Sequence, residues 1–322
     1  PPSNGYTSRV DNFGEVENKG IEFNVEGIAI NKGDLNWTIN ANIGFNRNKL
    51  KKLNSNLDFQ LGPSIGFSQA YPILFMVDQP LGIYWGAETD GVYSSWEEAN
   101  ASGIAGAAPG EIRYINHHVD LDDSGQPLEI QEINFDDYVK IGDPNPDFTY
   151  SISNNFSYKN WDANILFTGQ KGGDLFWVDS WQLSGLQKTT NILSSSYANS
   201  WIAPLYYENG NYIYDESIGN LNSVNHPGAM IETGSRAISS DRNIFDGSFI
   251  RLKNINIGYN FDLKNGKNMR VYLAGQNLVV WTDYPGYDPE VRTYTKNPQK
   301  RGVDFGTYPG TRSLLLGLKF NY

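Results

Sequence analysis

The sequence predicts an all-β protein, namely part of a transmembrane antiparallel β-barrel with long outer loops. Two patterns support this prediction. Apolar and polar side chains alternate with a period of two in several segments, and short connections between these segments alternate with long ones. No segment reaches the roughly 18 apolar residues of a membrane-spanning helix, but a barrel strand needs only about 10 alternating residues to cross.

The clearest alternation lies in residues 35–46. Every odd position from Leu35 to Phe45 is apolar, and every even position from Asn36 to Asn46 is Asn, Thr or Gly. Successive side chains of a strand point to opposite faces, whereas a helix would spread the same pattern around its axis. The segment is therefore predicted to be a strand with one apolar and one polar face.

The same pattern recurs along the chain. It is regular in residues 148–158, 161–168, 254–263 and 313–322. It is weaker near residues 20–31, 67–78, 81–94 and 268–281. Together with residues 35–46, these segments give about nine expected strands.

The connections between these strands alternate in length. The short ones lie near residues 31–34, 78–80, 159–160 and 264–267. The long ones lie near residues 49–66, 95–147, 171–248 and 282–311. An outer-membrane barrel has short periplasmic turns and long outer loops, whereas a soluble sandwich needs no such order. We therefore expect these strands to run toward the periplasm: 20–31, 67–78, 148–159, 249–262 and 312–322.

In such a barrel, each strand turns its apolar face to lipid and its polar face to a wet lumen. The side chains expected to face lipid are those of Trp37, Ile39, Ile43, Ile165, Ile257, Leu316 and Leu318. Those expected to face the lumen are Asn40, Asn42, Asn155 and Asn256.

The composition argues against several classes of protein. With 25 Lys and Arg against 36 Asp and Glu, the net charge is −11, and a nucleic-acid binder would instead need a basic face. There is no Cys, so disulfides, thiolate metal sites and cysteine nucleophiles are excluded. The three histidines, His117, His118 and His226, belong to no catalytic motif, and we expect no enzyme activity.

One acidic segment has the spacing of a cation site. Asp120, Asp122 and Ser124 lie two residues apart and precede Gly125, which lets a tight loop turn three oxygens toward one ion such as Ca²⁺. The twelfth position of this loop is Gln131, where an EF-hand would have a bidentate Glu. The alternative interpretation is an acidic turn in contact with water.

The insert at residues 171–248 is rich in aromatic residues among Asn and Ser. The candidates for contact with a substrate or partner are Trp177, Trp181, Trp201, Tyr206, Tyr207, Tyr212 and Tyr214. Aromatic faces and amides suit sugar rings and also peptides. The alternative interpretation is that these rings pack the insert's own small core or lie at the membrane interface.

Five sequence blocks occupy residues 12–22, 142–148, 248–261, 270–291 and 302–322. They read NFGEVENKGIE, GDPNPDF, SFIRLKNINIGYNF, RVYLAGQNLVVWTDYPGYDPEV and GVDFGTYPGTRSLLLGLKFNY. Together and in this order, the blocks resemble the C-terminal half of TonB-dependent outer-membrane transporters of the SusC/RagA type.

This resemblance implies a barrel of about 22 strands. Residues 1–322 would form its C-terminal part, with the plug domain and the TonB-contacting segment outside this chain. It also implies TonB-dependent import of an oligosaccharide or peptide nutrient across the outer membrane, with a SusD-like surface lipoprotein as a lid. The barrel would contact outer-membrane lipid, and the aromatic end, with Phe320 and Tyr322, would belong to the signal for barrel assembly.

Two other functions stay open at this point. A secreted carbohydrate-binding or carbohydrate-cleaving β-domain would explain the aromatic residues and the acidity, but not the ordered connection lengths or the terminal aromatic strand. A structural adhesin barrel would explain the strands without any transport. A plug and a TonB-contacting segment ahead of Pro1 would distinguish a transporter from an adhesin.

Overall fold

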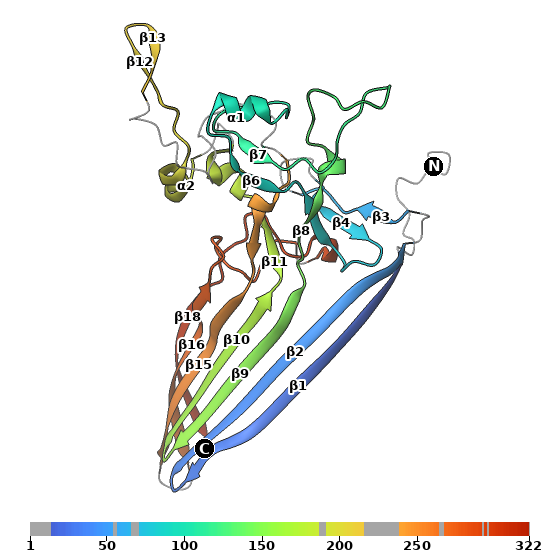
Figure 1. Cartoon of the computed structure of the whole chain (residues 1–322). Helices are drawn as coiled ribbons and strands as arrows, with labels where there is room; N and C mark the ends of the chain where they lie inside the picture. Colours follow the sequence, from blue (N-terminus) through green and yellow to red (C-terminus); the bar gives the residue numbers. More distant parts are fainter. Residues whose placement is uncertain are drawn as a thin grey trace, which may run out of the picture.

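The structure is a computed structural model. It describes residues 14–53, 57–65, 71–186, 191–215, 238–263, 267–291, 293–294 and 296–321. A single antiparallel sheet of seven long strands dominates it, in the order β1-β2-β9-β10-β15-β16-β18 (Figure 1). The strands are β1 (Gly14–Lys32), β2 (Leu35–Leu53), β9 (Pro146–Tyr158), β10 (Trp161–Gly172), β15 (Phe249–Asp262), β16 (Asn268–Thr282) and β18 (Ser313–Asn321).

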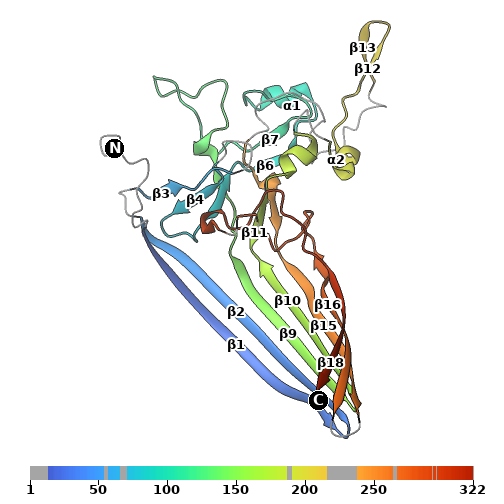
Figure 2. The ribbon, with the colours of Figure 1, turned by 180° about the vertical axis from the view of Figure 1, so that it is seen from behind.

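The connections of this sheet alternate as the sequence predicts. The last residues of β1, β9 and β15 lie together at one end of the sheet, and the described parts of the long connections lie at the other end (Figures 1 and 2). Gly33 and Lys159 have positive φ angles of 58° and 52°, which is the backbone conformation that two-residue hairpin turns require. The three long connections are residues 54–145, 173–248 and 283–312.

Two of the nine expected barrel strands are wrong. β2 pairs directly with β9, from Leu35 opposite Tyr158 to Gly44 opposite Thr149, so residues 67–78 and 81–94 belong to one long connection. They contain the short strands β4 (Ile73–Met76), β5 (Ile83–Gly86) and β6 (Thr89–Val92). β4 and β5 are buried mostly on both faces, so their apolar residues belong to a core and not to a lipid-facing strand.

The predicted facing of the remaining strands agrees with their pairing. Partners across a pair of strands share a face, and one row runs from Trp37 through Phe156, Ala163, Ile257 and Leu273 to Leu316. The neighbouring row runs from Thr38 through Asn155, Asn164, Asn256 and Ala274 to Leu315. All seven residues expected to face lipid lie on the first face, and the four expected lumen residues lie on the second.

One polar residue interrupts the apolar face. Asn154 lies opposite Ile39 on β2 and Ile165 on β10. Its side-chain oxygen accepts a hydrogen bond of 3.2 Å from the indole Nε1 of Trp37. Without this bond, the side-chain oxygen of Asn154 would lie unpaired among apolar side chains, which would destabilise the fold.

Aromatic rings border the apolar face at both ends. Near the turns, Trp161 lies 4.9 Å from Tyr259 between ring centroids, and near the loops Phe45 lies 5.5 Å from Phe148. On β9, Phe148 and Tyr158 are ten residues apart, about 33 Å along the strand at 3.3 Å per residue. At a tilt of about 40° this spans about 25 Å, the height of the apolar band of a transmembrane barrel.

None of the helices in the described ranges is long and apolar enough to cross a membrane. They are α1 (Trp96–Ala101) and α2 (Ser194–Asn199), with short helical turns at Phe135–Asp137, Gln182–Leu186, Asp241–Asn243 and Pro298–Lys300.

The long connections fold together into a layer at one end of the sheet, which we call the loop layer. Its further strands are β3 (Phe59–Leu61), β7 (Ile112–Tyr114), β8 (Val139–Gly142), β11 (Asp174–Trp177), β12 (Leu205–Glu208), β13 (Asn211–Tyr214), β14 (Ile244–Asp246) and β17 (Val303–Asp304). They form small sheets, of which β14-β11-β17 joins the second long connection to the third.

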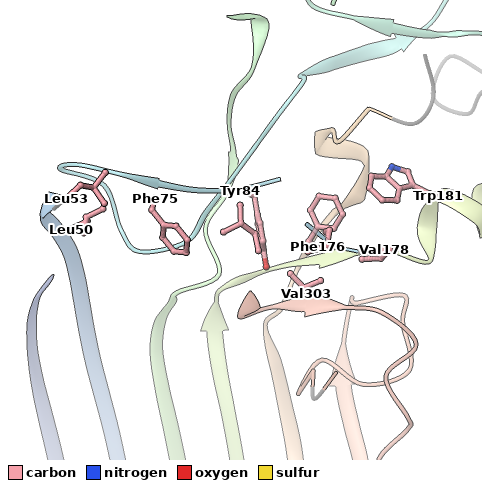
Figure 3. Packing of buried hydrophobic residues seen from close by; sticks show 10 residues of the cluster. Leu50, Leu53, Phe75, Tyr84, Phe176, Val178, Trp181 and Val303 are labelled. Atoms are coloured by element: carbon pink, nitrogen blue, oxygen red, sulfur yellow. The ribbon is translucent and has the colours of Figure 1, made fainter. Parts of the chain in front are cut away.

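The main apolar core lies in this layer (Figure 3). Its buried members are Leu50, Leu53, Ile65, Ile73, Phe75, Tyr84, Phe176, Val178, Trp181 and Val303. They come from the end of β2 and from all three long connections. The loop layer is therefore one packed unit rather than three independent loops.

Leu315 and Leu316 offer a matched test of the facing, because they are neighbours on β18 that lie on opposite faces. Leu316→Arg is expected to destabilise the folded barrel by about 2–4 kcal/mol, since a charged side chain would enter the apolar band, and Leu315→Arg is expected to cost far less. The measurement is the free energy of unfolding of the full-length protein in lipid bilayers. Equal costs would contradict the assigned faces.

Candidate functional site

The three tryptophans proposed to contact a ligand are packed inside the loop layer. Trp177, Trp181 and Trp201 are 7%, 3% and 8% exposed. Trp181 packs edge-on against Phe176, with 5.6 Å between ring centroids, and Trp177 packs in the same manner against Phe245. The structure thus gives these rings a packing role, which is the alternative interpretation of the sequence, and contact with a ligand stays a prediction.

The ring of Trp201 packs so closely against Gly110 that no larger residue fits at this position. A Cβ atom added to Gly110 would lie 2.4 Å from the ring of Trp201, and Gly110 has a positive φ of 82°. Any other residue here would be strained and would also collide with the ring. The ring therefore belongs to a close contact between the first and second long connections.

Tyr206, Tyr207, Tyr212 and Tyr214 lie on the β12–β13 hairpin, which projects from the loop layer (Figure 1). Tyr206 pairs with Ile213, and Tyr207 pairs with Tyr212. The side chains of these four tyrosines lie outside the described part of the structure. Their contact with a substrate or partner stays a prediction.

A cavity of about 380 Å³ lies beside Trp177, between α2 and residues 241–245. Its walls include Ser180, Ser196, Arg242 and Asn243. The amide Nδ2 of Asn243 donates a hydrogen bond of 2.8 Å to Oγ of Ser180. An aromatic ring with hydroxyl, amide and guanidinium groups suits a polar organic ligand such as a sugar or peptide. Sequence reasoning missed the serines and Asn243, because both residue types are common throughout the chain.

The polar face of the sheet carries its own bonded network near the turns. Nε of Arg270 donates to the carboxylate of Asp162 over 3.0 Å, and Nη2 of Arg270 donates to Oδ1 of Asn256 over 2.8 Å. Nδ2 of Asn260 donates to the same carboxylate over 2.8 Å. The face thus carries paired charges and amides, as a hydrated interior requires.

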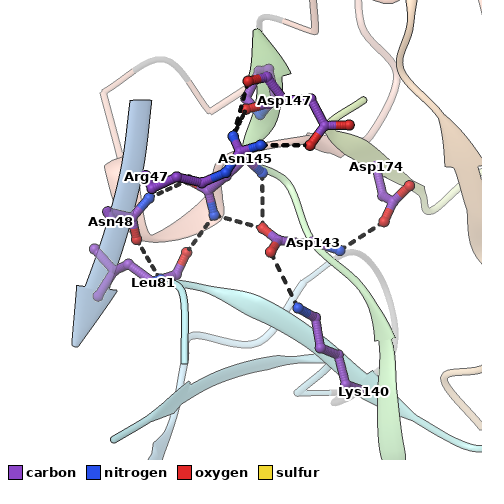
Figure 4. A network of polar contacts seen from close by, with 9 residues as sticks. Arg47, Asn48, Leu81, Lys140, Asp143, Asn145, Asp147 and Asp174 are labelled. Atoms are coloured by element: carbon purple, nitrogen blue, oxygen red, sulfur yellow. Dashed lines mark hydrogen bonds and ion pairs between the residues drawn. The ribbon is translucent and has the colours of Figure 1, made fainter. Parts of the chain in front are cut away.

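A second network fastens the loop layer to the sheet, and it contains the GDPNPD block (Figure 4). Oδ1 of Asp143 accepts hydrogen bonds from the backbone N and Nδ2 of Asn145, over 3.0 and 2.7 Å. Asn48 on β2 donates to Oδ1 of Asn145, and the carboxylate of Asp174 accepts from the backbone N of Asp143. The block therefore joins β2, β9 and β11 where the sheet meets the loop layer.

A third contact holds the connection at residues 283–312. Arg251 is 4% exposed, and its guanidinium pairs with Asp288 and, through Nε at 2.8 Å, with Glu290. Arg251 lies opposite Thr168, which places it on the polar face. The connection thus lies against the polar face, and breaking one partner of such a buried pair typically costs about 3–5 kcal/mol.

The acidic segment proposed to bind a cation forms a hydrogen-bonded turn. Oδ1 of Asp122 accepts from the backbone N of Ser124 and of Gln126, over 2.8 and 2.9 Å. The carboxylate of Asp120 accepts from the backbone N of Glu132 and from Nδ2 of Asn134. Within the described residues no group of three or more acidic or histidine side chains gathers for a metal ion.

Phe320 lies at the end of β18, whereas Tyr322 lies outside the described residues.

Known proteins resemble this chain along its whole length. TonB-dependent receptor P3 of Formosa agariphila is 33% identical over 334 residues, which cover 100% of this chain and 30% of that protein. TonB-dependent receptor SusC of Bacteroides thetaiotaomicron is 25% identical over 97% of this chain and 27% of its own length. No protein-family model matches the sequence. The chain spans about three tenths of the length of these relatives.

Solved structures show the same fold. The structure of the RagAB peptide transporter superposes with a TM-score of 0.71 at 19% identity, over 99% of this chain and 31% of that chain. The RagAB peptide importer in the "open-open" state superposes with a TM-score of 0.66 at 18% identity. The seven-stranded sheet and its loop layer therefore have the same fold as about three tenths of the matched RagAB chain.

Asp174 gives a test of how the loop layer depends on pH. Burial raises the pKa of the Asp174 carboxyl, and the charges of Asp143 and Asp246 add to this effect, although the backbone N–H of Asp143 opposes it. In the folded state, the pKa of the Asp174 carboxyl is above its unfolded value of about 4. Protonation of this carboxyl therefore favours folding at low pH, and the stabilisation is lost as the pH rises through the raised pKa.

Asp174→Asn is therefore expected to reduce the loss of loop-layer stability as the pH rises above about 4. The substitution keeps a side-chain oxygen for the backbone N–H of Asp143. The measurement is the rate of proteolysis in the loop layer across this pH range, compared between parent and variant. An unchanged pH profile would show that Asp174 is not the titrating group.

Calcium binding at residues 120–124 is a separate expectation. If Asp120 and Asp122 bind Ca²⁺, adding the ion should slow hydrogen exchange of the backbone amides in residues 117–134, and Asp122→Ala should remove this effect. Bound Ca²⁺ would have oxygen ligands at about 2.3–2.6 Å. Exchange rates that do not respond to Ca²⁺ would show that the segment is only a hydrogen-bonded turn.

Proposed function

This chain belongs to the TonB-dependent receptors of the SusC/RagA type, which are β-barrels of the outer membrane, and from this we propose that its parent protein imports a nutrient. The nutrient would be an oligosaccharide or a peptide, driven across the outer membrane by the TonB system. A SusD-like surface lipoprotein would act as the lid. The protein would carry out no chemistry on the nutrient, in keeping with relatives named as receptors and transporters.

The observation that best supports import is the loop layer over a sheet with a polar face. Its main core joins three connections, and the cavity beside Trp177 offers polar groups to a ligand. The polar face continues from this layer toward the turns with paired charges. A polar solute released from the loop layer would thus meet hydrogen-bonding groups along the interior.

The RagAB peptide importer is named with its substrate, whereas SusC and the Formosa receptors are named only as TonB-dependent receptors. The cavity beside Trp177 has the aromatic ring and hydroxyl groups that suit a sugar, and an Arg that suits a carboxylate of a peptide. Both classes stay within the proposal.

The β12–β13 hairpin gives the sharpest test of substrate contact. Replacing Tyr206, Tyr207, Tyr212 and Tyr214 together by Ser in the full-length receptor should lower uptake without loss of the folded barrel, because the hairpin projects from the core. The measurement is growth of a receptor-deletion strain on a panel of oligosaccharides and peptide digests, with heat-modifiable migration as the folding readout. Normal growth would place substrate binding elsewhere.

Trp181→Ala is the matched control for this test. Trp181 belongs to the core of the loop layer, and its removal should cost about 3–5 kcal/mol of stability. It should therefore make the loop layer sensitive to protease as well as lower uptake. The tyrosine variant should lower uptake alone, so the two outcomes separate a binding role from a packing role.

A further inference from the structure

A hollow of about 560 Å³ lies on the apolar face of the sheet, where β9, β10, β15 and β16 meet the loop layer (Figures 1 and 2). We call it the lipid-face hollow. Tyr150, Ile250 and Trp281 line it. Tyr150 and Ile250 lie opposite Gly169 on either side of β10, and Trp281 lies opposite Ile250. Gly169 lies four residues after Ile165, so this row shares the face that Ile165 turns to lipid.

The hollow exists because Gly169, in the middle of this row, has no side chain. A Cβ atom added to Gly169 would lie 2.5 Å from Cζ of Tyr150, so the tyrosine ring lies over the glycine. The hydroxyl of Tyr150 donates to the backbone oxygen of Phe249, over 3.5 Å. The ring therefore leans across the sheet, while Ile250 and Trp281 stand out beside it, 45% and 52% exposed. The result is a hollow with an aromatic floor and apolar walls.

The polarity around the hollow changes along the strands. Toward the turns, the next row on this face is wholly apolar and consists of Ile152, Phe167, Leu252 and Val279. Toward the loop layer, the rim of the hollow is formed by the polar residues Lys171, Ser248 and Asp283. Trp281 lies between these two levels, and an indole ring prefers this position at a membrane interface. A membrane lipid has the same order of parts, with acyl chains in the apolar band and a polar head group at the interface.

The rim carries charges of both signs. The side chain of Lys171 is 58% exposed, and its Nζ lies 3.4 Å from the carboxylate of Asp246. The exposed Asp283 follows β16, two strands away from Lys171. A phosphate would be attracted to the ammonium of Lys171, whereas a purely anionic head group would also meet the carboxylates of Asp246 and Asp283. A head group with both a phosphate and an amine complements the two signs of this rim.

We propose that the lipid-face hollow binds one lipid of the outer leaflet, and that this lipid has a zwitterionic head group with a phosphate and an amine. An acyl chain lies over the ring of Tyr150, between Ile250 and Trp281. The phosphate lies at Lys171 and the amine at Asp283. This inference goes beyond the proposed function, because it concerns the outer surface of the barrel and does not depend on the imported nutrient.

The position of the hollow gives the bound lipid a structural effect. Both ends of the second long connection border it, because the backbone N of Gly172 donates to Oγ of Ser248 over 2.8 Å and the backbone N of Gly247 donates to the oxygen of Gly173 over 3.1 Å. A lipid that binds only when these two ends lie together stabilises the folded form of the connection. Membrane composition is thereby linked to the stability of the loop layer.

The test uses the full-length receptor, stripped of lipid in detergent and reconstituted into bilayers of equal parts phosphatidylethanolamine and phosphatidylglycerol with the same acyl chains. Native mass spectrometry after mild extraction should show one retained phosphatidylethanolamine per receptor. Ile250→Trp fills the hollow with a ring and keeps the face apolar, so it should reduce this retention by about tenfold. The control is Leu318→Trp, the same exchange on the same face of β18 but outside the hollow, and it should retain lipid as the parent does.

A second variant tests the head group without changing the apolar walls. Lys171→Gln with Asp283→Asn should remove the preference for phosphatidylethanolamine over phosphatidylglycerol, because both charges of the rim are lost. A protease assay tests the structural effect. The second long connection of the parent should resist protease better in the mixed bilayer than in phosphatidylglycerol alone, and Ile250→Trp should lose this difference. Heat-modifiable migration reports on folding of the barrel in every variant.

Each other outcome would overturn the proposal. Unchanged retention in Ile250→Trp would show that the hollow holds no lipid, and equal losses in Ile250→Trp and Leu318→Trp would show only the ordinary lipid around a barrel. Equal retention of the two lipids by the parent would overturn the zwitterionic head group. Loss of receptor dimers in Ile250→Trp would assign the hollow to a second copy. If Ile250→Trp does not fold, the charge variant decides, and an unchanged lipid preference there would overturn the site.

Discussion

Backbone hydrogen bonding in a hydrocarbon environment is the constraint on which the rest of this structure depends. Without water, each N–H and C=O group of a spanning strand must pair with a neighbouring strand. The seven long strands satisfy one another in strict order from β1 to β18, and these two form the edges of the sheet in the described part of the chain. That order forces tight turns at one end and leaves every long connection at the other.

The same constraint moves the core out of the sheet. One face of the strands is apolar toward lipid and the other is polar toward the interior, so neither face can host an ordinary protein core. The buried apolar residues therefore gather in the loop layer, where Phe176, Val178 and Trp181 of the second connection meet Tyr84 of the first and Val303 of the third. Aromatic residues in a long outer insert thus serve packing, even where their composition suggests ligand contact.

Sequence periodicity predicted the seven strands because alternation is a direct consequence of having lipid on one side. It failed at residues 67–78 and 81–94 because the short strands β4 and β5 are apolar and buried on both faces. Asp78, with a positive φ of 68°, forms a turn between them that looks like a barrel hairpin in sequence. The cavity residues Ser180 and Asn243 could not be found, because only the folded loops bring them to Trp177.

The family block at residues 142–148 acquires a physical meaning from its position. Asp143 and Asn145 bond to β2, to the turn before β5 and to β11, so two long connections are fixed to the sheet at one point. Arg251 fixes the third connection through Asp288 and Glu290. Because both contacts lie where the strands leave the apolar band, the loop layer is held as a platform on the barrel.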